Sequence, residues 1–359
     1  MNSKRILKIG TLLILIAAMM IACVTVTSAS DWPLCRNTAG FTGHSTETIN
    51  LPLTEQWHSA APAVEENGAV VANNIAYMCS YAGKLYAFDV STGAEVPNYP
   101  VNIGSSYGSP AVDLANNKVY VIAGTNLYAF NLDGSTAWTK NVGSVGINYN
   151  EGPIIDEGYV YVLAGSQLQK YNAAGTPQWS TLAAGGSCQP SIMGDYVYSN
   201  AGGQIQKFNK ITGAQVTTGG FPLTVDYQQA SVATIDGKIF LKADKLYAYN
   251  ASNGNLIWSQ PCGGDSTYYD SPAVADGVVY VYGWDGKMYA FDEDNGATMT
   301  GFPSVTLNSP SSRNWNSPSV AGDKIFIGAG TSQKLKVLGA AGTANAGVVL
   351  EEHLCFSAD

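Results

Sequence analysis

Aromatic residues recur a few positions ahead of a short module that the chain repeats, and carboxylate, carboxamide and guanidinium groups lie among them. Flat apolar rings beside fixed polar groups are what a site needs to stack on a sugar or to hold a peptide. Packing of the same rings between neighbouring repeats is the alternative. The candidate binding residues are Tyr107, Tyr149, Asp226, Tyr227, Tyr268, Tyr269, Trp284, Arg313 and Trp315.

Groups that could catalyse a reaction or hold a metal form no recognised set. The three histidines, His44, His58 and His353, lie far apart and lack the spacing of a zinc site. Residues 292–296, DEDNG, resemble a calcium loop, but the glycine comes one position early and no Glu follows at the required spacing. We therefore expect a protein that is not an enzyme and that has no metal or cofactor.

The elements that must position the aromatic residues are short β-strands, because one hairpin pattern is written six times. In residues 246–258, LYAYNASNGNLIW, the side chains alternate with a period of two, and Asn253-Gly254 supplies a turn before the returning strand. The other copies are residues 85–96, 127–138, 168–179, 205–216 and 288–299, with a degenerate seventh at 335–338.

A second module precedes each hairpin and carries Pro in six of its seven copies. Pro cannot donate to a strand ladder and belongs at edges or strand starts, so this module predicts the innermost strand of each unit. Units of roughly 40 to 50 residues with four short strands are typical of propeller blades. The prolines are Pro62, Pro110, Pro153, Pro190, Pro272 and Pro318, and Ala230 takes the place in the remaining copy.

These patterns predict an all-β fold, a seven-bladed β-propeller of four-stranded antiparallel blades. Antiparallel order places the loop that enters the first strand and the loop between strands two and three on one face, so the candidate residues surround one channel mouth. Trp57 ends an unmatched strand, so residues 53–57 are expected to form the outer strand of the seventh blade and close the ring. The propeller then spans 31–339, with 31–57 as N-terminal motif and closing strand and 340–359 as a tail.

Residues 1–30 have the layout of a secretory signal peptide, with Lys4, Arg5 and Lys8 ahead of an apolar run and small residues after it. An uncleaved membrane anchor and lipidation of Cys23 are the alternatives. Either way we expect an exported protein in the periplasm, at the cell surface or outside the cell. Membrane contact is expected only through this N-terminal anchor or lipid.

The net charge of −9, with 13% charged residues, offers no basic surface for a phosphate backbone. Nucleic acid is therefore not an expected partner. We expect a monomer whose partner is a protein or a glycan at the cell envelope.

Residues 31–43, DWPLCRNTAGFTG, resemble the opening motif of secreted PQQ-like β-propellers, including BamB-like proteins, and the pattern at residues 87–96 resembles their repeat. The resemblance covers the mature chain and implies the propeller fold. The family includes quinoprotein dehydrogenases, but those resemble larger rings with adjacent cysteines, which this chain lacks. Cys35 stands where the family has Phe, and ring closure would bring Cys355 near it, so a Cys35–Cys355 disulfide is expected, with unpaired thiols as the alternative.

The sequence therefore favours a non-catalytic binding or scaffolding propeller that mediates protein or glycan contacts at the cell envelope. A glycan-active enzyme is the first alternative, and it would need two inward carboxylates among Glu151, Asp226, Asp265 and Asp270. A PQQ-dependent dehydrogenase is the second alternative.

Overall fold

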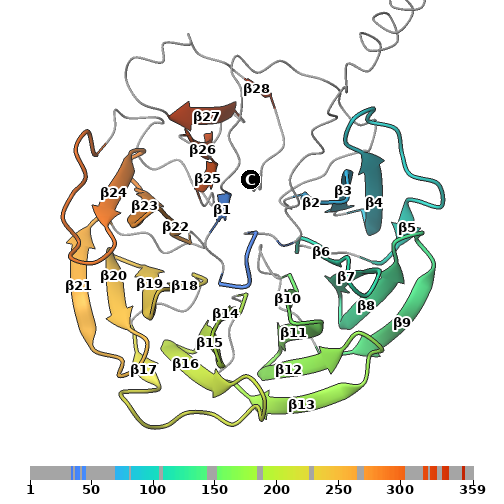
Figure 1. The fold of residues 1–359 in the computed structure, drawn as a ribbon, viewed down its shortest axis with the longest axis horizontal. Helices are drawn as coiled ribbons and strands as arrows, with labels where there is room; N and C mark the ends of the chain where they lie inside the picture. Colours follow the sequence, from blue (N-terminus) through green and yellow to red (C-terminus); the bar gives the residue numbers. More distant parts are fainter. Residues whose placement is uncertain are drawn as a thin grey trace, which may run out of the picture.

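The structure is a computed structural model, and it describes residues 34, 37–40, 43–45, 69–80, 82–104, 108–143, 152–183, 189–225, 230–264, 271–303, 318–321, 324–329, 334–338 and 350–351. This part of the chain is all-β and contains no helix. Its strands form seven sheets arranged around a central opening (Figure 1). That arrangement is a β-propeller and is compatible with the seven blades predicted.

Within each blade the strands follow chain order from the channel to the rim, and neighbouring strands are antiparallel, apart from one added parallel strand in blade 7. Blade 1 consists of β2 (Val70–Ala72), β3 (Ile75–Ser80), β4 (Lys84–Asp89) and β5 (Val101–Asn102). Blade 2 consists of β6 (Ala111–Asp113), β7 (Lys118–Ala123), β8 (Asn126–Asn131) and β9 (Thr136–Asn141). Blade 3 consists of β10 (Ile154–Asp156), β11 (Tyr159–Ala164), β12 (Gln167–Asn172) and β13 (Pro177–Leu182). Blades 4 and 5 consist of β14 (Ser191–Met193), β15 (Tyr196–Ala201), β16 (Gln204–Asn209) and β17 (Leu223–Thr224); and β18 (Ala233–Ile235), β19 (Lys238–Lys242), β20 (Lys245–Asn250) and β21 (Leu256–Pro261). Blades 6 and 7 consist of β22 (Ala273–Ala275), β23 (Val278–Tyr282) and β24 (Met288–Asp292); and β25 (Ser319–Ala321), β26 (Lys324–Ala329), β27 (Lys334–Leu338) and β28 (Leu350–Glu351), with β1 (His44–Ser45) beside β25.

The innermost strands are the ones that the Pro module predicted. Pro110, Pro153, Pro190 and Pro272 each immediately precede a strand at the channel, namely β6, β10, β14 and β22. Side chains of the middle strands point alternately to the two faces of the blade. Their apolar side chains are therefore buried against both neighbouring blades. Tyr120, Tyr161 and Tyr198 of β7, β11 and β15 occupy the same place in three blades and are at most 1% exposed.

Neighbouring blades are joined where a tryptophan of one outer strand lies on a glycine of the next blade. The indole Nε1 of Trp258 in β21 donates to the carbonyl of Glu293 at 3.0 Å, across the seam between blades 5 and 6. Gly296 has φ of 72°, and a β-carbon there would lie 2.7 Å from Cδ2 of Trp258. Trp138 with Gly175 and Trp179 with Gly213 make the same contact at the seams between blades 2 and 3 and between blades 3 and 4. The glycine of one repeat therefore lies at the seam with the preceding blade, and the tryptophan of the same repeat lies at the seam with the following blade.

Blades 1, 4 and 6 have no tryptophan at this position, and each has a different aromatic residue before a cis-proline, namely Tyr99, Phe221 and Phe302. Tyr99 and Phe221 are 6% and 4% exposed, and Phe302 packs against the core cluster that contains Val320 of blade 7. The Tyr99 hydroxyl donates to the carbonyl of Leu132 at 3.5 Å, in the turn of the next blade. The sequence analysis did not identify this second kind of seam.

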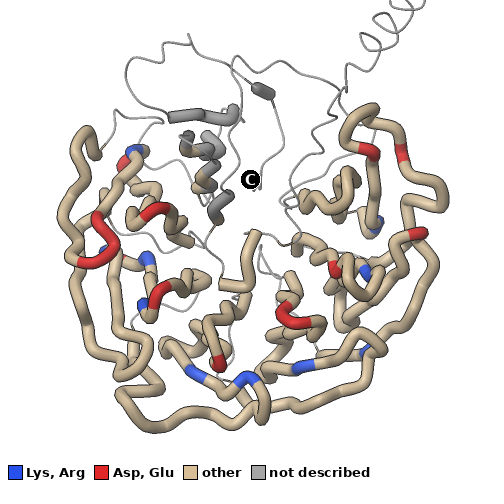
Figure 2. The backbone as a smooth tube through the Cα atoms, viewed as in Figure 1, with Lys and Arg blue, Asp and Glu red and all other residues tan. Residues whose placement is uncertain are grey.

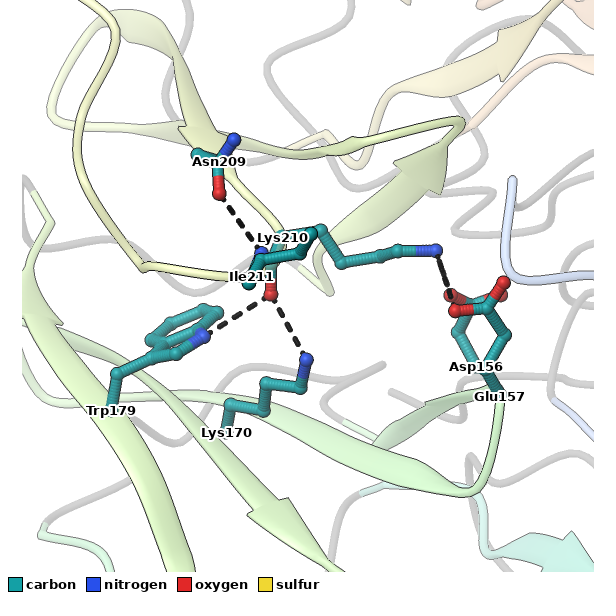
Figure 3. Close-up of polar contacts among 7 residues, drawn as sticks. All are labelled: Asp156, Glu157, Lys170, Trp179, Asn209, Lys210 and Ile211. Atoms are coloured by element: carbon teal, nitrogen blue, oxygen red, sulfur yellow. Dashed lines mark hydrogen bonds and ion pairs between the residues drawn. The ribbon is translucent and has the colours of Figure 1, made fainter.

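Polar groups complete the seam between blades 3 and 4 (Figure 3). The carbonyl oxygen of Lys210 accepts from Trp179 Nε1 at 3.2 Å and from Lys170 Nζ at 3.0 Å. The Lys210 ammonium pairs with Asp156 at 2.7 Å and with Glu157 at 3.1 Å. Burial, then the nearby Lys210 charge, lowers the pKa of Lys170. At the seam between blades 5 and 6 the lysine comes from the earlier blade and the acids from the later one. Lys238 of blade 5 pairs with Glu293 at 2.9 Å and with Asp294 at 2.7 Å.

Strands from the N-terminal and the C-terminal parts of the chain both join the sheet of blade 7. The closing strand predicted at residues 53–57 lies outside the described residues and stays a prediction. In the described part, β28, from the segment 340–359, pairs with β27. The N-terminal strand that does join this sheet is β1, which runs parallel to β25 at the inner edge. The physical reason is that inner-strand edges are open toward the channel and can pair with a passing chain.

We predict that Trp258→Ala lowers the free energy of unfolding by about 3 to 5 kcal/mol, because it empties a buried aromatic site and leaves a seam carbonyl without its donor. Urea denaturation followed by circular dichroism measures the loss. Leu256→Ala, on the same strand but 53% exposed, is the matched control and should change stability by less than about 0.5 kcal/mol. Equal losses for the two variants would contradict the seam assignment.

Candidate functional site

One face of the disc carries both the ends of the outer strands and the turns between the second and third strands. After the outer strand, Ile103, Val142 and Ala183 donate their backbone N–H to Gly83, Thr125 and Ser166 of those turns, each at 2.9 Å. Val225 repeats the bond to Gly203 at 2.8 Å. We call this the loop face, and these bonds confirm the placement predicted from antiparallel strand order.

The loops with the predicted aromatic residues connect described anchor points on the loop face. Each loop leaves the end of an outer strand and returns at the start of the next inner strand. The loops themselves lie outside the described residues. The predicted residues in them are Tyr107, Tyr149, Asp226, Tyr227, Tyr268, Tyr269, Arg313 and Trp315. Cys35 and Cys355 also lie outside the described residues, so the disulfide stays a prediction.

Trp284 is the predicted binding residue that the structure describes, and it is half-buried in the turn between β23 and β24. The next residue, Asp285, donates its backbone N–H to the carbonyl of Gly263 at 3.0 Å and accepts from the Tyr289 hydroxyl at 2.8 Å. Burial, then the hydrogen bond to Asp285, raises the pKa of Tyr289, so this hydroxyl stays protonated. The turn with Trp284 is thereby fixed beside residues 263–264, where the loop with Tyr268 and Tyr269 begins.

The inner strands begin in a ring of small and polar residues that touch one another from blade to blade. A β-carbon on Gly152 would lie 2.7 Å from the carbonyl oxygen of Ser109 and 3.0 Å from Nε2 of Gln189. The backbone N–H of Gln189 donates to the Ser231 hydroxyl at 3.0 Å. We call these four residues, one each from blades 2 to 5, the collar. It lies at the inner ends of the loops.

The collar contains a buried carboxamide whose hydrogen-bonding groups have no partner among the described residues. Neither Nε2 nor Oε1 of Gln189 has a hydrogen-bond partner in this part of the chain, and Gln189 is 2% exposed. Ser191 Oγ and Asn200 Oδ1 are likewise buried and unpaired, although the Asn200 amide donates to the Ala230 carbonyl at 2.9 Å. Each unsatisfied buried group costs about 1 to 3 kcal/mol. Such groups suit an ordered water or a neutral ligand group that both donates and accepts.

The sequence analysis missed this polar set, although a signal for it is present. Blade 4 reads YVYSNA in β15, where β11 of blade 3 reads YVYVLA, so Ser199 and Asn200 replace two apolar residues in the middle of a buried strand. Gln189 stands where Ser109 and Gly152 stand in neighbouring blades. These positions are apolar or small in the neighbouring blades. Polar residues at them indicate that the interior of blade 4 differs from that of its neighbours.

Charged side chains do not gather into one patch on the described residues. Acidic groups are spread around the ring (Figure 2). Within the described part of the chain, no group of three His, Cys, Asp or Glu side chains is arranged to hold a metal ion. The same part contains no helix that is long and apolar enough to cross a membrane.

Comparisons with known proteins agree with the propeller architecture. A family model described as outer membrane protein assembly factor BamB matches residues 54–147 and 201–344. The crystal structure of BamB from Moraxella catarrhalis is similar with a TM-score of 0.59 and 17% identity, over 74% of this chain and 83% of that one. The computationally designed protein Ika8 is similar with a TM-score of 0.51 and 14% identity, over 78% and 97% of the two chains. No curated protein matches this chain.

We predict that Gln189→Leu raises the free energy of unfolding by about 1 to 2 kcal/mol, because it removes two buried polar atoms that lack partners and keeps most of the volume. Thermal and urea unfolding measure the change. Gln178→Leu, at an exposed position of β13, is the control and should be within about 0.5 kcal/mol of the unsubstituted protein. A loss of stability at residue 189 would mean that the native carboxamide does have a partner, such as an ordered water.

Proposed function

Because the chain belongs to the family of the outer membrane protein assembly factor BamB, we propose that it is an exported, non-catalytic scaffold that binds other proteins at the cell envelope. The observation that carries this proposal is the family match, which spans more than half of the chain. An assembly factor for outer membrane proteins acts on other proteins, and the same class of partner is proposed here. The signal-like residues 1–30 support an envelope location.

The loop face is the proposed docking surface, and the contrast with the opposite face supports this choice. On the opposite face the turns between third and fourth strands satisfy their own polar groups. Asp292 Oδ1 accepts from the N–H groups of Asp294 and Asn295, each at 3.0 Å, and Asn209 Oδ1 accepts from Ile211 and Thr212 at 3.0 and 2.9 Å. In the collar, by contrast, Nε2 and Oε1 of Gln189 have no hydrogen-bond partner among the described residues. Groups of this kind beneath the loop face favour it over the opposite face as the place where a partner docks.

Aromatic anchors are the second support for the loop face. Tyr and Trp are enriched among residues that dominate the binding free energy of protein interfaces. Five of the seven blades have Tyr or Trp in the loop before the inner strand, and Trp284 lies in a turn that is hydrogen-bonded to the start of one of these loops. A rigid ring would hold such anchors in place before a partner arrives, which lowers the entropic cost of binding.

A glycan-active enzyme remains the alternative, and its candidate carboxylates Glu151, Asp226, Asp265 and Asp270 lie in the undescribed loops. Binding of a glycan in place of a protein and the monomeric state also remain predictions. Incubation of the protein with envelope glycans and analysis of the products separates the enzyme from the scaffold, because only the enzyme generates shortened glycans.

We predict that Tyr269→Ala combined with Trp315→Ala lowers capture of envelope proteins at least tenfold while leaving the melting temperature almost unchanged. The proposal assigns both side chains to the docking surface, and truncating surface anchors removes binding free energy without opening a cavity in the fold. The measurement is a pull-down from detergent-solubilised envelope, quantified by mass spectrometry, together with thermal unfolding of the same protein.

Ile211→Ala is the matched control, since Ile211 is 72% exposed and lies in a turn of the opposite face. It should retain full capture. If the double variant unfolds at a much lower temperature yet still captures the same proteins, these aromatic residues belong to the packing between blades, and the loop-face proposal is wrong.

A further inference from the structure

The turn between β20 and β21 of blade 5 contains an asparagine whose side-chain oxygen and nitrogen have different roles. Oδ1 of Asn250 accepts hydrogen bonds from the backbone N–H of Ser252 at 2.9 Å, from the Ser252 hydroxyl at 2.5 Å and from the backbone N–H of Asn253 at 3.2 Å. Because backbone N–H groups can only donate, the acceptor must be the amide oxygen. Nδ2 makes no hydrogen bond among the described residues, and it is not one of the buried polar atoms that lack a partner. Solvent therefore reaches this nitrogen.

These residues form the tripeptide Asn250-Ala251-Ser252, which is the acceptor pattern for N-linked glycans: Asn, any residue except Pro, then Ser or Thr. The pattern occurs once in the sequence. The other five hairpins have Asp or Asn at the same position, but none of them combines Asn with a hydroxyl residue two places later. Their tripeptides are DVS at 89–91, NLD at 131–133, NAA at 172–174, NKI at 209–211 and DED at 292–294.

The surroundings of this turn leave the acceptor accessible on the opposite face of the disc. Ser252 and Asn253 are exposed, and the neighbouring loop of blade 4, residues 217–220, is exposed as well. A β-carbon on Gly219 would lie 2.7 Å from the carbonyl oxygen of Ser252, and one on Gly254 would lie 3.0 Å from the carbonyl oxygen of Gly220. Blade 4 therefore approaches the turn through glycines, which place no side chain beside it.

An N-linked glycan is compatible with the hydrogen bonds of this turn. The modification joins a sugar to Nδ2 and leaves the amide carbonyl in place, so Oδ1 of Asn250 can accept the same three bonds. In the corresponding turn of blade 2, Nδ2 of Asn131 donates to the Ser135 hydroxyl at 2.9 Å, so that nitrogen is already engaged. The turn of blade 5 thus combines the acceptor pattern with a nitrogen that no neighbour uses.

We propose that Asn250 is an N-glycosylation site of the exported protein. In the reaction a bond forms between Nδ2 and the anomeric carbon of a phosphate-activated glycan, the bond between that carbon and the phosphate oxygen breaks, and Nδ2 loses one proton. An envelope transferase supplies this donor. The glycan covers the opposite face beside the seam of blades 4 and 5, which leaves the loop face open to a partner. This site rests on the export that is part of the proposed function.

The test is intact-mass analysis and peptide mapping of the full chain isolated from the envelope of its native cells. We expect a glycan mass on the peptide that contains Asn250, and loss of the whole mass in Asn250→Asp and in Ser252→Ala. The aspartate variant removes the nitrogen but keeps a turn acceptor, as at Asp292, whose Oδ1 accepts two backbone N–H bonds at 3.0 Å. Ser252→Thr keeps the hydroxyl and should keep the glycan.

Blade 4 provides matched variants in the same kind of turn. Oδ1 of Asn209 accepts from the N–H groups of Ile211 and Thr212 at 3.0 and 2.9 Å, but no hydroxyl residue lies two places after it. Asn209→Asp should therefore leave the glycan mass unchanged. Ile211→Ser gives this turn the acceptor pattern at a position that is 72% exposed, and we expect that variant to carry a second glycan.

The proposal is overturned if the chain isolated from the envelope carries no glycan on the peptide with Asn250, or if the glycan mass survives Asn250→Asp. Thermal unfolding of each variant shows that the comparison is made between folded proteins, and Ser252→Thr against the unsubstituted protein serves should Ser252→Ala fail to fold. An envelope protein without the glycan overturns this site alone. A chain that is absent from the envelope overturns the proposed function as well.

Discussion

The ring depends on the contact between an aromatic ring of one blade and a glycine of the next. A single four-stranded blade cannot bury both faces, so its stability comes from its neighbours. At the seam of blades 5 and 6, Trp258 covers Gly296 and its indole satisfies the Glu293 carbonyl. The positive φ of the glycine and the absence of a side chain there let the indole approach the turn backbone. One contact thus supplies apolar burial and satisfies a turn carbonyl.

This constraint also explains why the polar residues are distributed unevenly. Seam turns on the opposite face use their Asp, Asn and Lys groups for their own geometry and for ion pairs between blades, as at Lys210. Those groups are therefore not available to a ligand. Among the described residues, the carboxamide of Gln189 in the collar of blade 4 has no such partner.

The elements with a local signal could be predicted from the sequence, and those that depend on distant contacts could not. Strand alternation and the Pro module have periods within one repeat, so the hairpins and the innermost strands were predicted correctly. The seam residues Tyr99 and Phe221 differ in type and position from the tryptophans, so the hairpin pattern that ends in tryptophan did not identify them. The place of residues 39, 40 and 43 depends on strands about 150 to 280 positions later in the chain, and the opening motif contains no sign of that pairing. Of the candidate binding residues, only Trp284 lies in the described part, so the aromatic site as a whole stays a prediction.

The N-terminal segment changes how the ring should respond to stress. Seams connect only adjacent blades, whereas N-terminal residues contact the inner edges of blades 4, 5 and 7, through the carbonyl groups of Ala39, Gly40 and Gly43 and through β1. Opening the ring between blades 5 and 7 would therefore require breaking this shared partner as well as the seams around blade 6.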